Sequence, residues 1–218
     1  MFAKWFLGIW MTVVVLAAFT WAPASADLGQ ISRIIFFHIP TAWVSVLAFL
    51  ACMIYSIRYL QRRDIEDDRA AAFSAELGLL FSLIATVSGS IFAKSTWGSY
   101  WNWDPRETSI LVLLLIYAAY FALRSAVDER ERRGALAAVY AVLAFVTVPV
   151  LVFVVPRLPA VQSLHPTDSV VTSGGKLNMD GRMFVVFLAS LAGFTGLAAW
   201  VLRLRIRAAR AFDRIVKE

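Results

Sequence analysis

The sequence has only two histidines, His38 in the stretch "RIIFFHIPTAW" and His165 in "SLHPTDS". Imidazole is a common metal ligand, and two imidazoles can occupy both axial positions of a haem iron. Taken singly, each histidine is equally typical of an interfacial residue hydrogen-bonded to backbone or water. Neither has a cysteine or carboxylate at ligand spacing, so a zinc site has little support. The histidines alone leave a haem ligand pair and two unrelated interfacial residues as alternatives.

A second candidate is the aromatic segment "WGSYWNWDPRETS", residues 97–109. It places Trp97, Tyr100, Trp101 and Trp103 within seven positions. Such rings offer flat faces to a large planar ligand, and their N–H and O–H groups can still meet water or carboxylates. An aromatic belt at a membrane surface has the same composition. The segment is too compact for each ring to anchor separately in lipid, so we expect some rings to stack on one another or on a ligand.

The end of this segment has the pattern of a helix start. Asp104 suits the N-cap, Pro105 the first helical position, and Glu107 the third position of a capping box. An apolar run follows from Ile110. We therefore predict a helix from residue 105, which would hold the aromatic loop rigidly.

The elements that position these residues are predicted to be membrane helices. The chain has 218 residues, of which 60% are hydrophobic and 17% charged, and a mean hydropathy of +0.71. These values predict an all-α polytopic membrane protein with a single domain, residues 1–218, in one bundle of six transmembrane helices. The predicted spans are residues 5–21, 39–57, 70–93, 105–123, 135–155 and 183–202, with Pro149 kinking the fifth.

The distribution of basic residues predicts the orientation. Fifteen of the 21 Lys and Arg residues fall at one end of the predicted bundle. The positive-inside rule then places both termini in the cytoplasm and turns the loops 94–108 and 156–182 outward, with both histidines on that outer face. The same rule accounts for the net charge of +6 through orientation and membrane lipids, without nucleic acid.

Two further features concern the chain ends. "APASA" before Asp27 resembles a signal-peptide cleavage site, but the preceding apolar run exceeds the usual length of about 7–15 residues. We therefore expect a retained first span. The basic C-terminal tail predicts an amphipathic helix on the cytoplasmic surface that binds lipid headgroups. The single cysteine, Cys52, lies in an apolar run and is interpreted as a packing residue.

The segment "WGSYWNWD", with its flanking pattern, resembles the WWD signature of the CcmC family, haem-handling membrane proteins of bacterial cytochrome c maturation. The resemblance covers nearly the whole chain, including the settings of both histidines. It implies that His38 and His165 are axial ligands of haem b. The implied signature residues are Trp97, Gly98, Trp101, Trp103 and Asp104. "WDPRET" also resembles the longer CcsA-type synthases and CcmF-type lyases, which carry extra histidines.

The resemblance also implies a location and partners. The location is the bacterial inner membrane, with the haem site facing the periplasm. The partners are a CcmE-like periplasmic haem chaperone, the ABC-type subunits CcmA and CcmB, and the small membrane protein CcmD. The chain would bind and deliver haem without being an enzyme.

Three functions follow from these patterns. In the first, haem is clamped between the histidines and delivered to the chaperone, and Arg106 is a candidate partner for a propionate. The second is a membrane b-type cytochrome that passes electrons from quinol. The placement of both histidines in loops or at span ends argues against it, since cytochrome ligands usually project from helices. A solute channel is the third, but only Glu76 approaches a midplane position.

Overall fold

The computed structural model describes residues 2–158, 161–165, 170 and 175–217. Across these residues the chain forms six α-helices and no strand; one isolated bridge joins Ser25 to Gly29. The helices are α1 (Phe2–Thr20), α2 (Ile35–Arg62), α3 (Ile65–Trp97), α4 (Pro105–Ala126), α5 (Arg130–Pro149) and α6 (Gly181–Lys217). The all-α prediction is confirmed.

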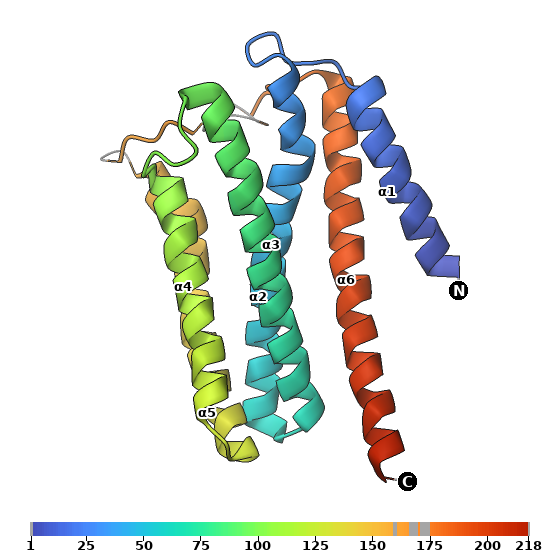
Figure 1. The fold of residues 1–218 in the computed structure, drawn as a ribbon, viewed down its shortest axis with the longest axis vertical. Coiled ribbons are helices and arrows are strands. Elements are labelled where there is room, and N and C mark those ends of the chain that lie inside the picture. Colours follow the sequence, from blue (N-terminus) through green and yellow to red (C-terminus); the bar gives the residue numbers. More distant parts are fainter. Residues whose placement is uncertain (1, 159–160, 166–169, 171–174, 218) are drawn as a thin grey trace.

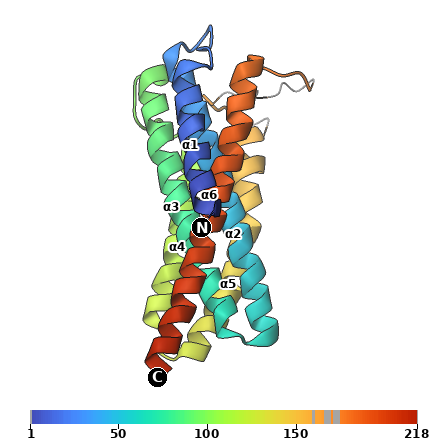
Figure 2. The same ribbon diagram turned by 90° about the vertical axis from the view of Figure 1, so that its right-hand side faces the viewer.

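The helices are arranged around the antiparallel pair α2 and α3. In Figure 1, α4 and α5 lie on one side of this pair and α6 and α1 on the other, while Figure 2 shows α1 against α6. In the core, Phe49 of α2 stacks on Tyr117 of α4 with ring centroids 3.6 Å apart. Phe49 also requires the absence of a side chain at Gly78, where a Cβ would stand 2.3 Å from its ring. Cys52 is fully buried beside this cluster, as predicted.

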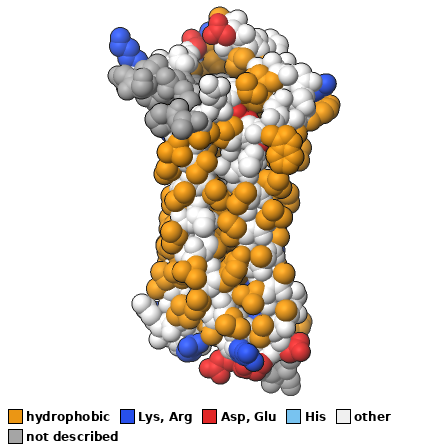
Figure 3. All heavy atoms as spheres, turned by 90° about the vertical axis from the view of Figure 1, so that its left-hand side faces the viewer, with side chains coloured by type: hydrophobic (Ala, Val, Ile, Leu, Met, Phe, Trp, Pro, Cys, Tyr) orange, Lys and Arg blue, Asp and Glu red, His pale blue; other side chains and the backbone are white. Residues whose placement is uncertain are grey.

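Among the described residues, five helical segments are long and apolar enough to cross a membrane. The apolar stretch Lys4–Thr20 of α1 is shorter than these five. Figure 3 shows apolar side chains along the length of the bundle, with charged side chains gathered at its ends. The chain is therefore a multi-pass membrane protein. That α1 is a sixth span, that it is retained in the mature protein, and that both termini face the cytoplasm stay predictions.

Helix α2 begins earlier than predicted, and this corrects the setting of His38. A 3-10 turn, Gln30–Ile34, leads directly into α2 at Ile35, so His38 lies in the first turn of the helix and not before it. Pro40 is tolerated inside this helix for a visible reason. Its missing N–H leaves the Phe36 carbonyl without the usual partner, and the buried Ser190 hydroxyl of α6 donates to that carbonyl.

Helix α5 changes its hydrogen bonding at Pro149. The α-helix ends there and continues as a π-helix, Val150–Val154, and a short 3-10 turn, Val155–Arg157. Proline lacks the N–H that the regular ladder needs, which accounts for the break. The change of helix type at Pro149 is thus observed, and the kink there stays a prediction.

The C-terminal tail is not a separate surface helix, contrary to our prediction. It extends α6 without interruption to Lys217 and pairs with α3. Arg69 bonds Asp213, Arg205 bonds Glu76, and Arg210 bonds Glu66. These charges satisfy one another across the helix interface, so the tail is fixed to the bundle on its α3 side.

Candidate functional site

His38 and His165 meet at the end of the bundle where α2 begins and α3 ends. Their ring centroids are 6.1 Å apart and their planes are inclined by 44°. A metal-to-imidazole bond is about 2 Å long and the nitrogen stands about 1 Å from its ring centroid, so two imidazoles on opposite sides of one metal have centroids about 6 Å apart. The two histidines of the chain therefore have the separation of a ligand pair.

The ring of His38 is oriented by α3. Its Nδ1 lies 3.0 Å from Ser88 Oγ, and the Ser88 hydroxyl donates in turn to the carbonyl of Ile84 at 2.8 Å. Because the hydroxyl hydrogen is used there, Ser88 accepts from the Nδ1–H of His38. This assigns the tautomer in which Nε2 carries the free lone pair. Gly89 leaves room for the His38 ring, since a Cβ at this position would stand 3.0 Å from His38 Cε1.

The contact of Ser88 with His38 leads to a prediction for Ser88→Ala. Losing the acceptor for Nδ1–H frees the ring to rotate and to change tautomer, so haem affinity is expected to fall by about 10-fold. Titration of the purified protein with haem, followed by absorbance, measures this. Ser95→Ala removes an exposed hydroxyl from the same helix and is expected to leave the affinity unchanged. Equal affinities for the Ser88 and Ser95 variants would refute the orienting role.

His165 is positioned by the buried carboxylate of Asp104. Asp104 Oδ2 accepts from the hydroxyl of Ser163 at 2.9 Å and from the backbone N–H of Leu164 at 2.6 Å. Ser163 Oγ accepts in turn from the backbone N–H of His165 at 3.1 Å. Asp104 thus joins the outer loop, residues 156–182, to the aromatic loop.

The predicted capping box at the start of α4 is also present, and its bond from Asp104 uses Oδ1, whereas the bond to Leu164 uses Oδ2. Asp104 Oδ1 accepts from the backbone N–H of Arg106 at 2.9 Å, while Glu107 Oε2 accepts from the backbone N–H of Asp104 at 3.2 Å. The start of α4 at Pro105 is confirmed. One carboxylate therefore begins the helix with one oxygen and holds the His165 loop mainly with the other.

His165 is partly shielded from water and lies near the charge of Arg106. Burial, followed by the nearby charges of Arg106 and His38, lowers the pKa of His165 to about 4, against the opposing effect of Asp104. His165 is therefore neutral at pH 7, the form that binds metals. Among the described residues, His165 Nδ1 and Arg106 Nε are buried without a hydrogen-bond partner. A metal and an anionic oxygen are the groups that such atoms bind.

The aromatic cluster divides into two parts. Trp97, the last residue of α3, has its ring centroid 5.8 Å from that of His165 and packs edge-on against Phe92 at 5.5 Å. Trp101 and Trp103 pack edge-on against each other at 5.8 Å. Tyr100 and Trp103 are 61% and 69% exposed. Trp97 therefore borders the histidines, while the other rings form an open surface beside them.

Two backbone features shape this loop. Gly98 ends α3 in the left-handed region, with φ 81°, and its N–H donates to the carbonyl of Lys94 at 3.2 Å. Trp103 also has positive φ, 56°, although it is not a glycine. These two residues turn the chain out of α3 and into α4, so Gly98 has a structural role in the loop.

The structure adds Ser88, Phe92 and Ser163 to the residues predicted for the site. Ser88 and Phe92 are four residues apart on α3 and so share one face, but a serine and a phenylalanine in an apolar helix carry no signal of a site. Ser163 lies two residues before His165, where only its contact with Asp104 gives it a role.

The arrangement defines a class of protein: a multi-pass helical membrane protein with paired histidines beside an aromatic loop at one end of its bundle. The family model described as Heme exporter protein C matches residues 1–217. The chain belongs to this family.

Relatives with the same printed name support the assignment. The chain is 33% identical to Heme exporter protein C of Bradyrhizobium diazoefficiens over 80% of its own length and 65% of the relative. The identity to the Rhodobacter capsulatus protein is 29%, over 87% of this chain and 77% of the relative. The identity to the Escherichia coli K12 protein is 34%, over 69% of this chain and 62% of the relative. The chain thus matches slightly under two thirds of two of these relatives.

Proposed function

We propose that the chain binds haem as cargo and delivers it for cytochrome c maturation. The observation that carries this proposal is the 6.1 Å separation of the two histidine rings. The tautomer inferred for His38 from its contact with Ser88, and the lowered pKa of His165, agree with it. Membership in the Heme exporter protein C family agrees with haem as the cargo. His38 and His165 would supply the two axial ligands of haem b.

The surrounding residues match the other parts of such a cargo. Trp97 and Phe92, both within 6.4 Å of the His165 ring centroid, offer aromatic surface to the macrocycle, and Trp101, Trp103 and Tyr100 extend it outward. Arg106, with its unpartnered Nε, is suited to a propionate. Asp104 positions His165 rather than facing the cargo.

Delivery needs binding that can be reversed. His38 is fixed in a helix, whereas His165 lies in a loop held through Asp104. We infer that the His165 side opens when the cargo leaves, since loops move more readily than helix turns. The recipient would be a CcmE-like periplasmic haem chaperone. The site would face the periplasm from the inner membrane, with CcmA, CcmB and CcmD as associated subunits.

Visible absorbance of the purified protein tests the ligand pair. The wild type is expected to give a low-spin haem spectrum, while His38→Ala and His165→Ala each lose it. Leu164→Ala removes an exposed side chain beside His165 and should keep the spectrum. The assignment fails if both histidine variants retain an unchanged low-spin spectrum and normal helical content.

A b-type cytochrome is the second candidate, and the location of His38 on a helix is the observation that favours it. Mixing the haem-loaded protein with an apo-chaperone separates the two functions. Transfer of haem to the chaperone supports delivery. Retained haem that is reduced by quinol supports the cytochrome.

A further inference from the structure

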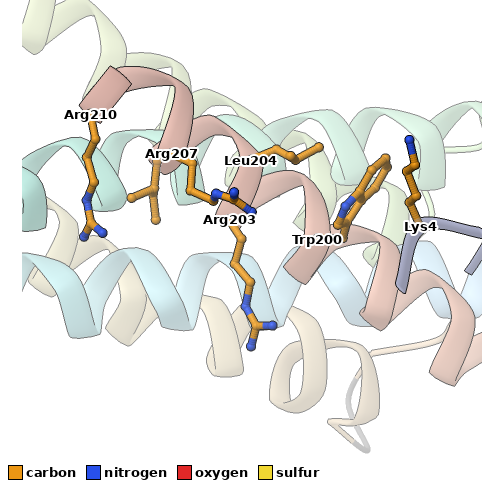
Figure 4. Close-up of a pocket in the computed structure, with 7 residues that line it drawn as sticks. Lys4, Trp200, Arg203, Leu204, Arg207 and Arg210 are labelled. Carbon is orange, nitrogen blue, oxygen red and sulfur yellow. The ribbon is translucent and has the colours of Figure 1, made fainter. Parts of the chain in front are cut away.

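A groove of about 580 Å³ lies between the start of α1 and the C-terminal half of α6. Neither histidine lines it. It is lined mainly by the stretch of α6 where the predicted span ends. Lys4 contributes from the start of α1, and the other lining residues come from α6: Trp200, Arg203, Leu204, Ile206, Arg207 and Arg210. Figure 4 shows Lys4 beside Trp200, with Arg203 and Arg207 further along α6.

The groove combines an apolar wall with basic groups. Trp200, Arg203 and Arg207 are spaced by three and four residues, so they share one face of α6. Trp200 and Leu204 supply apolar surface beside the guanidinium groups. A tryptophan next to arginines at the end of an apolar helix is typical of the level where lipid chains meet headgroups.

Four basic groups line the groove, and three of them lack an acidic partner among the described residues. Of the acidic residues of α3, Glu66 pairs with Arg210 at the end of the groove, and Glu76 pairs with Arg205, which does not line it. Arg203, Arg207 and Lys4 form no ion pair among the described residues; Lys4 instead lies 5.4 Å from the centre of the Trp5 ring. The groove is therefore complementary to an anion attached to an apolar chain.

We propose that this groove binds one anionic phospholipid. Arg203, Arg207 and Lys4 bind the phosphate, and Trp200 and Leu204 contact the first part of an acyl chain. A lipid fits better than an acidic protein segment because the apolar wall and the charges lie together at the level where the apolar part of α6 ends. The site is independent of haem binding.

The test uses the full-length protein in detergent, with native mass spectrometry at increasing phosphatidylglycerol or phosphatidylcholine. The wild type is expected to retain one phosphatidylglycerol at least 10-fold more tightly than phosphatidylcholine. Arg203→Gln/Arg207→Gln should lose about 10- to 30-fold of the phosphatidylglycerol affinity. Arg130→Gln/Arg132→Gln removes equal charge from exposed residues at the start of α5 and should keep it.

Three outcomes would overturn the proposal. Equal losses in the two double variants would assign the effect to net charge. Soluble glycerol phosphate that competes as well as the lipid would assign the groove to a free phosphate. An oligoglutamate peptide that binds at Arg203 and Arg207 in place of phosphatidylglycerol would assign it to an acidic protein segment. Unchanged helical content and haem spectrum in Arg203→Gln/Arg207→Gln would show that the variant is folded.

Discussion

Asp104→Asn is expected to weaken haem binding by about 10- to 100-fold while α4 stays capped. The two carboxylate oxygens share Ser163 but otherwise have different partners. Oδ1 caps the helix at the N–H of Arg106, and asparagine can accept this bond equally well. Oδ2 accepts from the N–H of Leu164 at 2.6 Å, and an amide NH2 in its place cannot accept this bond. The Ser163 hydroxyl lies 2.9 Å from Oδ2 and 3.1 Å from Oδ1, so it keeps only the longer of its two contacts. The substitution therefore releases the loop that carries His165 and spares the helix start.

Haem titration and thermal unfolding, measured on the same samples, separate these effects. The haem affinity should fall, with little change in the unfolding temperature of the haem-free protein. Asp64→Asn makes the same change at the N-cap of α3, where Asp64 Oδ1 accepts from the N–H of Glu66 at 2.9 Å. This control should leave the affinity unchanged. Wild-type affinity in Asp104→Asn would show that the carboxylate does not position His165.

Arg124→Met is expected to lower the free energy of unfolding by about 3–5 kcal/mol. Arg124 bonds both carboxylate oxygens of Asp68, at 2.6 and 2.9 Å, and the Asp68 side chain is only 5% exposed. Removing the arginine leaves a buried carboxylate without its counter-ion, and this is the main source of the loss. Tyr120, whose hydroxyl lies 3.4 Å from Arg124, offers a weaker contact.

Chemical unfolding in detergent, with and without a second change, tests this origin. Arg124→Met/Asp68→Asn removes both charges and is expected to recover much of the loss, because no buried charge is left unpaired. Arg205→Met breaks the exposed pair with Glu76 and should lower the stability by at most about 1 kcal/mol. If Arg124→Met and Arg205→Met are equally stable, burial of the Asp68 pair does not contribute as argued.

The sequence predicted the parts of the fold that depend on local pattern. The apolar runs located the helices, and Asp104, Pro105 and Glu107 located the start of α4, because capping is decided within a few residues. The meeting of His38 and His165 at one end of the bundle was predicted from topology. Their separation was not, since it depends on the packing of α2 against α3 at Ser88 and on the contacts of Asp104 with the loop that carries His165.

The errors have a common physical origin. His38 was expected just before the second span because that span was predicted to begin at Ile39, whereas α2 begins at Ile35 and the Ser190 hydroxyl from α6 supports the helix around Pro40. The tail was expected on the membrane surface, but it continues α6 to Lys217, and Glu66 and Glu76 of α3 pair with it there. In both cases a partner more than 100 residues away in the chain decides the local structure.

The positive φ of Trp103 has a consequence for experiments on the aromatic loop. A non-glycine residue in the left-handed region costs roughly 1–2 kcal/mol, and an edge-on aromatic pair contributes about 0.5–1.5 kcal/mol. The contact of Trp103 with Trp101 is therefore of the size needed to offset the unfavourable backbone. The indoles therefore stabilise the path of the chain, in addition to the surface for haem that we propose for them. Truncating Trp101 is thus expected to alter the path of the loop as well as its aromatic surface. Trp103→Gly would remove the ring and also the unfavourable backbone conformation.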